Sequence, residues 1–217
     1  MVHDFCCTTF RFDPKSMKKV LAVLAILLLS LHMQGQDNVM LNRIKAANGK
    51  IKTFEADLNE TMVKPKKIVT REGKIYFAAP KEFAALFSEG SCIIANETKI
   101  KLDIGRLHGT FKLKDGSMMQ SLGNIFIYGF QGRVEELFHE NSYNYTTKTE
   151  NGLHIITGTI IKKNLIGLGY KKVVLKYNTD DLLFKEVVLY DYSGNEDTYT
   201  ISNVKYDVPV DKKRFQF

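Results

Sequence analysis

Three histidines and one cysteine are the side chains beyond the N-terminal region that could do chemistry: His108, His139, His154 and Cys92. Metal sites are typically built from His and Cys at short, regular spacings such as i, i+4 or Cys-x-x-Cys. These histidines are far apart in the sequence, and Cys92 has no histidine nearby. The spacing indicates neither a metal centre nor a cysteine nucleophile, and we expect no cofactor.

The sequence also lacks the motifs of a hydrolase. A Ser–His–Asp site on a hydrolase sheet needs a nucleophile presented by a motif such as Gly-x-Ser-x-Gly, and none occurs. Glu135 and Glu136 are adjacent, so they face opposite sides of a strand or diverge by about 100° on a helix. We interpret them as solvated charges and Cys92 as a buried small hydrophobe. The sequence therefore predicts a protein that is not an enzyme.

The N-terminal region is organised like a secretory leader. Two lysines after Met17 precede an apolar run of about ten residues, and small and polar residues follow, as in a signal peptide. The run is too short for a membrane span. We expect residues 1–16 to be a mis-called extension, residues 17–35 to be the signal peptide and residues 36–217 to be one domain.

The charges argue against a nucleic-acid partner. The 217 residues carry 31 Lys and Arg against 24 Asp and Glu, a formal net charge of +7. These charges are scattered and form no basic run, so we expect a solvated surface. Cleavage near residue 35 leaves Cys92 as the one cysteine, and none follows the leader directly. We therefore expect no disulfide and no lipid anchor, and a soluble monomer beyond the inner membrane.

Alternating apolar residues predict an antiparallel sheet with one apolar face. Ile75 and Phe77 point to one side of a strand, and Ile100 and Leu102 alternate with lysines in another. Pro80 lacks a backbone donor and is expected at a strand end or a sheet edge. Something must cover the apolar face.

Two segments are expected to be helical. An apolar stripe ending before Gly49 predicts an amphipathic helix at about residues 37–48. Residues 117–131 are the most apolar part of the mature chain, and we expect a short helix there, either in one piece or broken at Gly123. A strand is the alternative for residues 125–130.

The remaining segments are predicted as strands and turns. Residues 71–73 (Arg-Glu-Gly) indicate a tight turn between strands at 68–70 and 74–79. After residue 131 the chain is predicted to be nearly all strand and turn, in an evenly spaced antiparallel meander. The strands expected in the meander are 143–149, 153–161, 172–177, 183–192 and 199–206.

Together these elements describe a mainly β (α+β) single-domain fold. We expect an antiparallel sheet curled into an open half-barrel, covered by the N-terminal helix and short central helices. This arrangement resembles the periplasmic outer-membrane lipoprotein carrier family, the LolA-like proteins. The likeness rests on the helix at 37–48, the strand at 52–58, residues 73–83 and the closing strand and tail at 203–217. Residues 73–83 (Gly-Lys-Ile-Tyr-Phe-Ala-Ala-Pro-Lys-Glu-Phe) are similar to the family's Gly-x-hydrophobic-x-hydrophobic-x-x-Pro-x-x-hydrophobic signature.

The resemblance implies a function. LolA-like proteins bind the acyl chains of lipoproteins in a hydrophobic cavity and carry them across the periplasm from the inner to the outer membrane. An inner-membrane ABC-type lipoprotein release transporter loads the carrier, and an outer-membrane acceptor unloads it. The family usually has an arginine just before the signature proline, which ties the sheet to the lid helices; this sequence has Ala79 there.

Apolar residues of the expected sheet and central helix are the candidates for lining the cavity. Stiff aromatic side chains could prop a cavity open, and methionines could adapt to a ligand. The candidates are Phe54, Leu58, Ile75, Phe77, Phe83, Phe87, Leu102, Met118, Met119, Leu122, Phe126 and Phe130. Two alternatives remain: a binding protein for another lipid, such as a glycolipid or acylated precursor, on the same fold, and a lipoprotein-sensing interaction domain.

Overall fold

The computed structural model describes residues 38–217 apart from positions 97, 106, 114–117, 141–142 and 162–168. The chain divides into two compact units, Met1–Met40 and Leu41–Phe217, and the elements described below belong to the second unit, apart from residues 38–40 at the start of the first helix. The predicted extension and signal peptide lie outside the described residues. Within the described part, no helix is long and apolar enough to cross a membrane.

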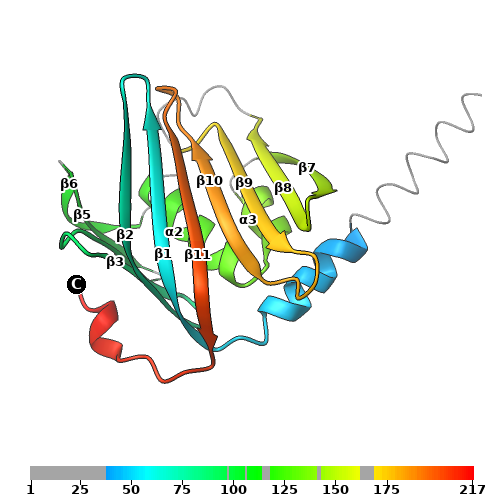
Figure 1. The fold of residues 1–217 in the computed structure, drawn as a ribbon, viewed down its shortest axis with the longest axis horizontal. Coiled ribbons are helices and arrows are strands. Elements are labelled where there is room, and N and C mark those ends of the chain that lie inside the picture. Colours follow the sequence, from blue (N-terminus) through cyan, green and yellow to red (C-terminus); the bar gives the residue numbers. More distant parts are fainter. Residues whose placement is uncertain (1–37, 97, 106, 114–117, 141–142, 162–168) are drawn as a thin grey trace, which may run out of the picture. The chain divides into compact units, whose positions relative to one another are not determined.

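One antiparallel sheet of eleven strands forms the body of this unit. The strand order is β6-β5-β4-β3-β2-β1-β11-β10-β9-β8-β7, and the described strands leave the sheet open, because β6 and β7 lie at opposite ends of that order (Figure 1). The predicted open half-barrel is confirmed. The strands are β1 (Thr53–Lys64), β2 (Lys67–Ala78), β3 (Glu82–Phe87), β4 (Cys92–Ala95), β5 (Lys99–Ile104), β6 (Leu107–Lys112), β7 (Tyr143–Glu150), β8 (Leu153–Ile160), β9 (Lys172–Asn178), β10 (Phe184–Tyr190) and β11 (Glu196–Tyr206).

Alternation along β1 and β2 gives the sheet its apolar face. Phe54, Ala56 and Leu58 of β1 are buried, and the residues between them are more exposed. The register pairs Phe54 with Phe77 and Ala56 with Ile75 of β2. Because directly opposed residues of an antiparallel pair share a face, their side chains form one apolar surface.

The strand β2 runs without interruption through its twelve residues, so the predicted turn at residues 71–73 is wrong. Arg71 lies directly opposite Glu60 of β1, and the two side chains form an ion pair. Gly73 serves a close approach of two strands rather than a turn, since a Cβ there would lie 2.2 Å from the carbonyl oxygen of Leu86 on β3. Arg71 and Gly73 are of residue types that often mark a turn, but here they contribute to the pairing of strands.

Two helices cover the apolar face: α2 (Met118–Phe130) and α3 (Val134–Glu140) (Figure 1). The helix expected within residues 117–131 is confirmed as one continuous helix, and the strand alternative is wrong. The helix α3 lies where the sequence predicts only strands and turns. Its buried residues recur at i, i+3 and i+4, a spacing that predicts a helix but is easily missed in a seven-residue element.

The first described helix spans residues 38–48, as its apolar stripe predicts. Within the second unit it buries Ile44 and, at its end, the amide side chain of Asn48. That amide donates to the carbonyl oxygens of Ile44 and Leu182 at 2.9 and 2.8 Å and accepts from the N–H of Phe184 at 3.2 Å. One side chain therefore ties the end of the helix to the start of β10.

A smaller apolar cluster lies on the outer face of the sheet and holds the C-terminal tail. The 3-10 helix η2 (Lys212–Phe215) packs Phe215 with Tyr76 and Ile94. Cys92 contacts the border of this cluster and is half-buried, so the expectation of a buried cysteine is wrong. Both faces of the β2–β4 region are thus partly covered.

The contact between α3 and the sheet depends on a glycine. A Cβ at Gly158 of β8 would lie 2.3 Å from the ring of Phe138, so we expect Gly158→Ala to lower the free energy of unfolding by about 1–3 kcal/mol. A Cβ at Gly123 of α2 would meet Leu113 and Ala95 at ordinary distances of 3.8 and 3.9 Å. Gly123→Ala is therefore the control and should stabilise by about 0.5–1 kcal/mol. Urea unfolding of the two variants checks this, and an equal loss in both would contradict it.

Candidate functional site

Aromatic rings from the sheet and from α2 meet on the concave face. The ring of Phe130 lies 5.0 Å from that of Phe54 and 5.6 Å from that of Phe77, centroid to centroid. Phe126, one helical turn earlier, lies 5.0 Å from Phe83. The spacing of four residues puts both helical rings on the side of α2 that faces the sheet. The helix covers the sheet through edge-to-face and tilted ring contacts.

The structure brings the sequence-predicted lining residues together on this face. Their described side chains are 0% to 7% exposed. Strand pairing places those on β1, β2, β3 and β5 on the same side of the sheet. The residues are Phe54, Leu58, Ile75, Phe77, Phe83, Phe87, Leu102, Leu122, Phe126 and Phe130. For Met118 and Met119 the structure describes the helical backbone, and their side chains lie outside the described part.

The face also includes aromatic residues that the sequence analysis did not single out. Tyr199 of β11 lies 5.1 Å from Phe126, ring to ring. Tyr177 of β9 donates a hydrogen bond of 2.8 Å to the carbonyl oxygen of Gly129, and Phe184 lies against Phe130 at 5.0 Å. Alternation within the C-terminal meander was the signal that could have found them, once β11 was known to pair with β1.

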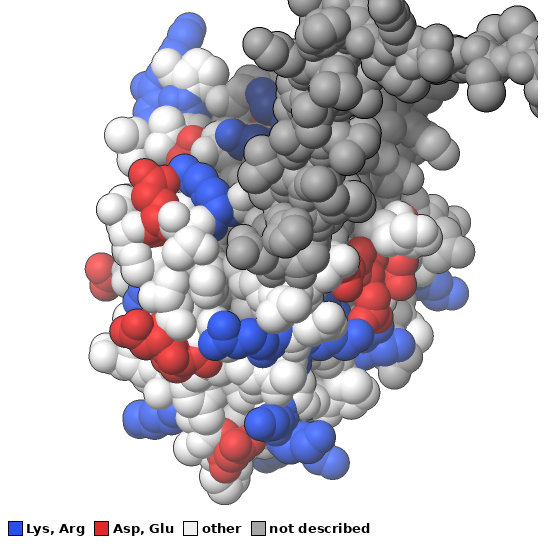
Figure 2. Space-filling view, turned by 90° about the vertical axis from the view of Figure 1, so that its right-hand side faces the viewer, with Lys and Arg blue, Asp and Glu red and all other residues white. Residues whose placement is uncertain are grey.

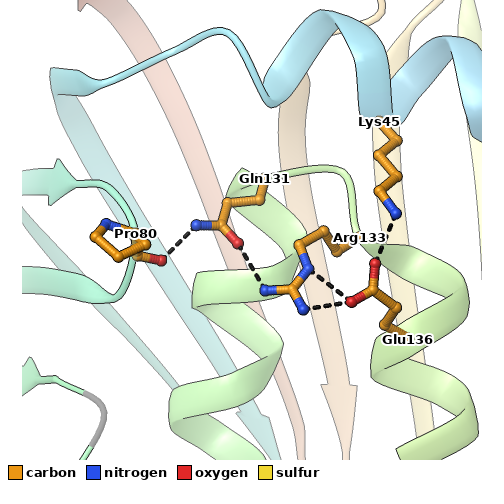
Figure 3. Close-up of polar contacts among 5 residues, drawn as sticks. All are labelled: Lys45, Pro80, Gln131, Arg133 and Glu136. Atoms are coloured by element: carbon orange, nitrogen blue, oxygen red, sulfur yellow. Dashed lines mark hydrogen bonds and ion pairs between the residues drawn. The ribbon is translucent and has the colours of Figure 1, made fainter.

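A polar clasp fixes the C-terminal end of α2 to the sheet (Figure 3). The Gln131 amide donates to the carbonyl oxygen of Pro80, and Arg133 donates to the Gln131 oxygen at 3.3 Å. Arg133 also pairs with Glu136 of α3, through Nε at 2.8 Å and through Nη2. Lys45 of the first helix reaches the same carboxylate at 2.7 Å. The clasp therefore links the β2–β3 connection, both covering helices and the first helix.

Ala79 stands where the LolA-like family usually has an arginine, and the clasp provides another link between the sheet and the helices. The resemblance implies that a side chain of the sheet ties the sheet to the helices. Here the β2–β3 connection supplies an acceptor, the Pro80 carbonyl, and the helical side supplies the donor, Gln131. Glu136, expected to be a solvated charge, is partly exposed but also paired: hydrogen bonds from Arg133 and Lys45 lower the pKa of its carboxyl to about 2.

A charged group interrupts the apolar face toward the tip of the β1–β2 hairpin. Glu60 is 1% exposed and pairs with Arg71, whose Nη2 lies 2.7 Å from the carboxylate. Burial raises the pKa of Tyr199 well above its usual value, and a hydrogen bond to Glu60 adds to this. Burial and the nearby Glu60 carboxylate raise the pKa of Asp197 to about 6. Among the described residues, nothing hydrogen-bonds the Oδ1 atom of Asp197.

The outer face offers a different kind of surface. A groove of about 610 Å³ lies between the sheet and η2, and polar side chains such as Asp57, Lys74 and Asn203 line it. Lys74 and Asn203 both contact the Asp57 carboxylate, at 2.5 and 2.7 Å. Polar surface predominates in the groove and these charged groups are paired with one another, so the concave face is the better candidate for a lipid.

The histidines remain separate in the structure. His108 lies on β6, His139 on α3 and His154 on β8. His108 contacts Asp103 at 2.6 Å on the exposed edge of the sheet. Nowhere in the described part do three or more His, Cys, Asp or Glu side chains gather in a way that could hold a metal ion.

The fold and the face define a class of protein: an open half-barrel whose apolar concave side is covered by helices. Neither known family descriptions nor curated proteins match the sequence. Among solved structures, LolA superfamily protein NE2245 from Nitrosomonas europaea is 10% identical and aligns over 83% of this chain and 97% of its own, with a TM-score of 0.44. A putative outer membrane lipoprotein-sorting protein domain from Vibrio parahaemolyticus is 12% identical over 81% and 94%, with a TM-score of 0.44.

Mycobacterium tuberculosis lipoprotein LppX is a further match, 14% identical over 81% of this chain and 98% of its own, with a TM-score of 0.37. A member of the LolA superfamily, the family that the sequence resembles, is thus among the structural neighbours.

The clasp should make stability depend on acid. Glu136 has a pKa lowered from 4.5 to about 2, so the clasp contributes its full stability above pH 4.5 and loses it as the pH falls toward 2. We expect Glu136→Gln to lower the free energy of unfolding by about 1 kcal/mol at neutral pH, since the carboxylate is partly solvated. The difference from the wild type should vanish near pH 2. Glu135→Gln, outside the clasp on the same helix, is the control, and a difference independent of pH would refute the assignment.

Asp197 should have the opposite pH dependence. Its pKa is raised from 3.8 to about 6, so the ionised carboxylate destabilises the fold fully above pH 6, and this cost disappears as the pH falls below 3.8. We expect Asp197→Asn to stabilise by about 1–2 kcal/mol at pH 8 and by little at pH 4, measured by urea unfolding. Glu196→Gln next to it is the control. A loss of stability in Asp197→Asn at pH 8 would show that the carboxylate has a favourable partner.

Proposed function

We propose that this protein is a periplasmic carrier that binds the acyl chains of lipoproteins on its concave face and moves them from the inner to the outer membrane. The observation that supports the proposal most directly is the way α2 covers that face. Phe126 and Phe130 rest on the sheet through ring contacts. The contacts from Tyr177 and Gln131 fix the C-terminal end of the helix. The rest of α2 can therefore separate from the sheet while that end stays in place.

The energetics suit a carrier that must release its cargo. Burying one methylene gains about 0.8 kcal/mol, so a sixteen-carbon chain gains on the order of 12 kcal/mol. In the closed arrangement aromatic rings fill the space around Phe130, and an acyl chain must replace those contacts. The cost of lifting the rings from the sheet offsets much of the gain. The net affinity then stays well below the practical limit of roughly 20 kcal/mol, and the cargo can leave.

In this proposal an inner-membrane ABC-type release transporter loads the protein, and an outer-membrane acceptor unloads it. A second candidate is a binding protein for another lipid, such as a glycolipid or acylated precursor. This second candidate is kept because the helices are tied to the sheet in a different way. Here Gln131 donates to the Pro80 carbonyl oxygen, whereas the resemblance implies an arginine at the position of Ala79.

A disulfide that locks α2 onto the sheet tests the proposal. A Cβ at Gly123 would lie 3.9 Å from the Cβ of Ala95 on β4, a separation that suits a disulfide. We expect the Ala95→Cys/Gly123→Cys protein, with Cys92→Ala to prevent mispairing, to bind a fluorescent acyl probe and a triacylated lipopeptide when reduced. Oxidation should weaken both at least tenfold, and reduction should restore them.

The matched control is the Cys92→Ala single variant under the same redox conditions, which should bind equally well in both states. Unchanged binding by the oxidised double-cysteine protein would remove the space under α2 from the site. Mass spectrometry of lipid released from protein purified without detergent then separates the candidates. Acylated N-terminal cysteine peptides support the lipoprotein carrier, whereas glycolipid or free phospholipid supports the second candidate.

A further inference from the structure

The tip of the β1–β2 hairpin combines exposed aliphatic side chains with lysines. Residues 63–68 are all exposed, and Ile68 and Val63 keep 68% and 40% of their surface accessible. Lys64 and Lys67 form the last pair of the ladder, and Lys66 lies in the turn between them. No acidic residue occurs from position 61 to position 70. The tip is therefore both basic and apolar.

The positive charge of the tip is not cancelled by its surroundings. No ion pair of the described part engages Lys64, Lys66 or Lys67, although Lys64 lies close enough to Asp197 to act on the pKa of that carboxyl. Strand pairing brings Glu196 opposite Val63 as the nearest acidic group on the neighbouring strand. Three exposed lysines thus have two half-buried carboxylates nearby, those of Glu196 and Asp197.

The tip projects at one end of the sheet. Figure 1 shows the hairpin as the element that reaches furthest at this end. In Figure 2 several blue side chains lie at this upper end of the described surface, while blue and red side chains are interspersed lower down. The turn between β10 and β11 lies beside the hairpin at nearly the same height, so a flat surface that meets the tip would lie along this end of the sheet.

We propose that the tip docks the protein on an anionic phospholipid bilayer. The lysines would pair with phosphates at the headgroup level, where each basic residue strengthens binding, and Val63 and Ile68 would enter the interface. The aliphatic pair is small, and the tip has no aromatic anchor of the kind that typically dominates a protein interface, which favours a membrane over a protein partner. Lysines alone would suffice to keep a hairpin from aggregating, but they would leave the exposed Ile68 without a role. This inference concerns a surface other than the concave face and stands whether or not that face binds acyl chains.

Vesicle flotation tests the proposal. The full-length protein should float with vesicles of phosphatidylcholine and phosphatidylglycerol at low ionic strength and remain behind with phosphatidylcholine alone. We expect Lys64→Gln/Lys66→Gln/Lys67→Gln to weaken binding to the anionic vesicles by about a hundredfold, because each lysine contributes about fivefold. Because these side chains are exposed, the variant should unfold at the same temperature as the wild type.

The matched control is Lys50→Gln/Lys99→Gln/Lys112→Gln, which removes the same charge from exposed positions away from the tip. It should bind within about twofold of the wild type, since charges beyond a Debye length from the bilayer are screened. Equal weakening in both triple variants would show a net-charge effect and overturn the proposal, as would binding that the tip substitutions leave unchanged.

The entry of Val63 and Ile68 into the bilayer can be measured separately by tryptophan fluorescence. The sequence contains no tryptophan, so Ile68→Trp places a single reporter at the tip. Its emission should shift to the blue with anionic vesicles and not with neutral ones, and Ile68→Ser should weaken flotation several-fold while all three lysines remain. An unshifted emission in protein that floats with the vesicles would overturn the insertion of the tip.

Discussion

The pairing of the first strand with the last is the constraint on which the rest of this structure depends. The register of β1 with β11 joins β1–β6 to β7–β11, which would otherwise be two separate sheets. It places Leu58 beside Ile201, so the apolar surface continues from β1 to β11. It also places Glu60 beside Tyr199. Contacts this distant in sequence cost loop-closure entropy, and the buried rings under α2 must repay it.

The cover over the concave face combines two kinds of interaction with different consequences. Ring contacts from Phe126 and Phe130 depend little on direction, so the helix can separate from the sheet and return to it. The hydrogen bonds of Gln131 and Arg133 depend strongly on direction, and they act at one end of the helix, beside Gly132, whose φ of +66° suits glycine. Apolar cover with a polar attachment at one end is an arrangement that allows opening without loss of the fold.

Sequence reasoning reached the open half-barrel, the central helix and the apolar face because these depend on alternation and helical spacing. It failed where a residue type serves an unusual purpose. Arg71 and Gly73 look like a turn, yet one is half of a buried ion pair and the other lets two strands approach. Glu136 pairs with Arg133 three residues before it and also with Lys45, which is distant in the chain and unrelated to it by any local pattern. Pairing between distant polar residues is set by tertiary structure, and one sequence does not contain that information.

The hairpin β1–β2 carries three different surfaces along its length. Near its base, Phe54 and Phe77 belong to the apolar face; midway, Glu60 and Arg71 form a buried ion pair; at the tip, exposed lysines surround Ile68. A buried ion pair stabilises a fold little compared with apolar residues of the same size. Alternation along the strands puts Val63 and Ile68 on the outer face of the hairpin, opposite the face that carries the ion pair and the rings under α2. The two surfaces can then act separately, the concave face on acyl chains and the tip on a membrane.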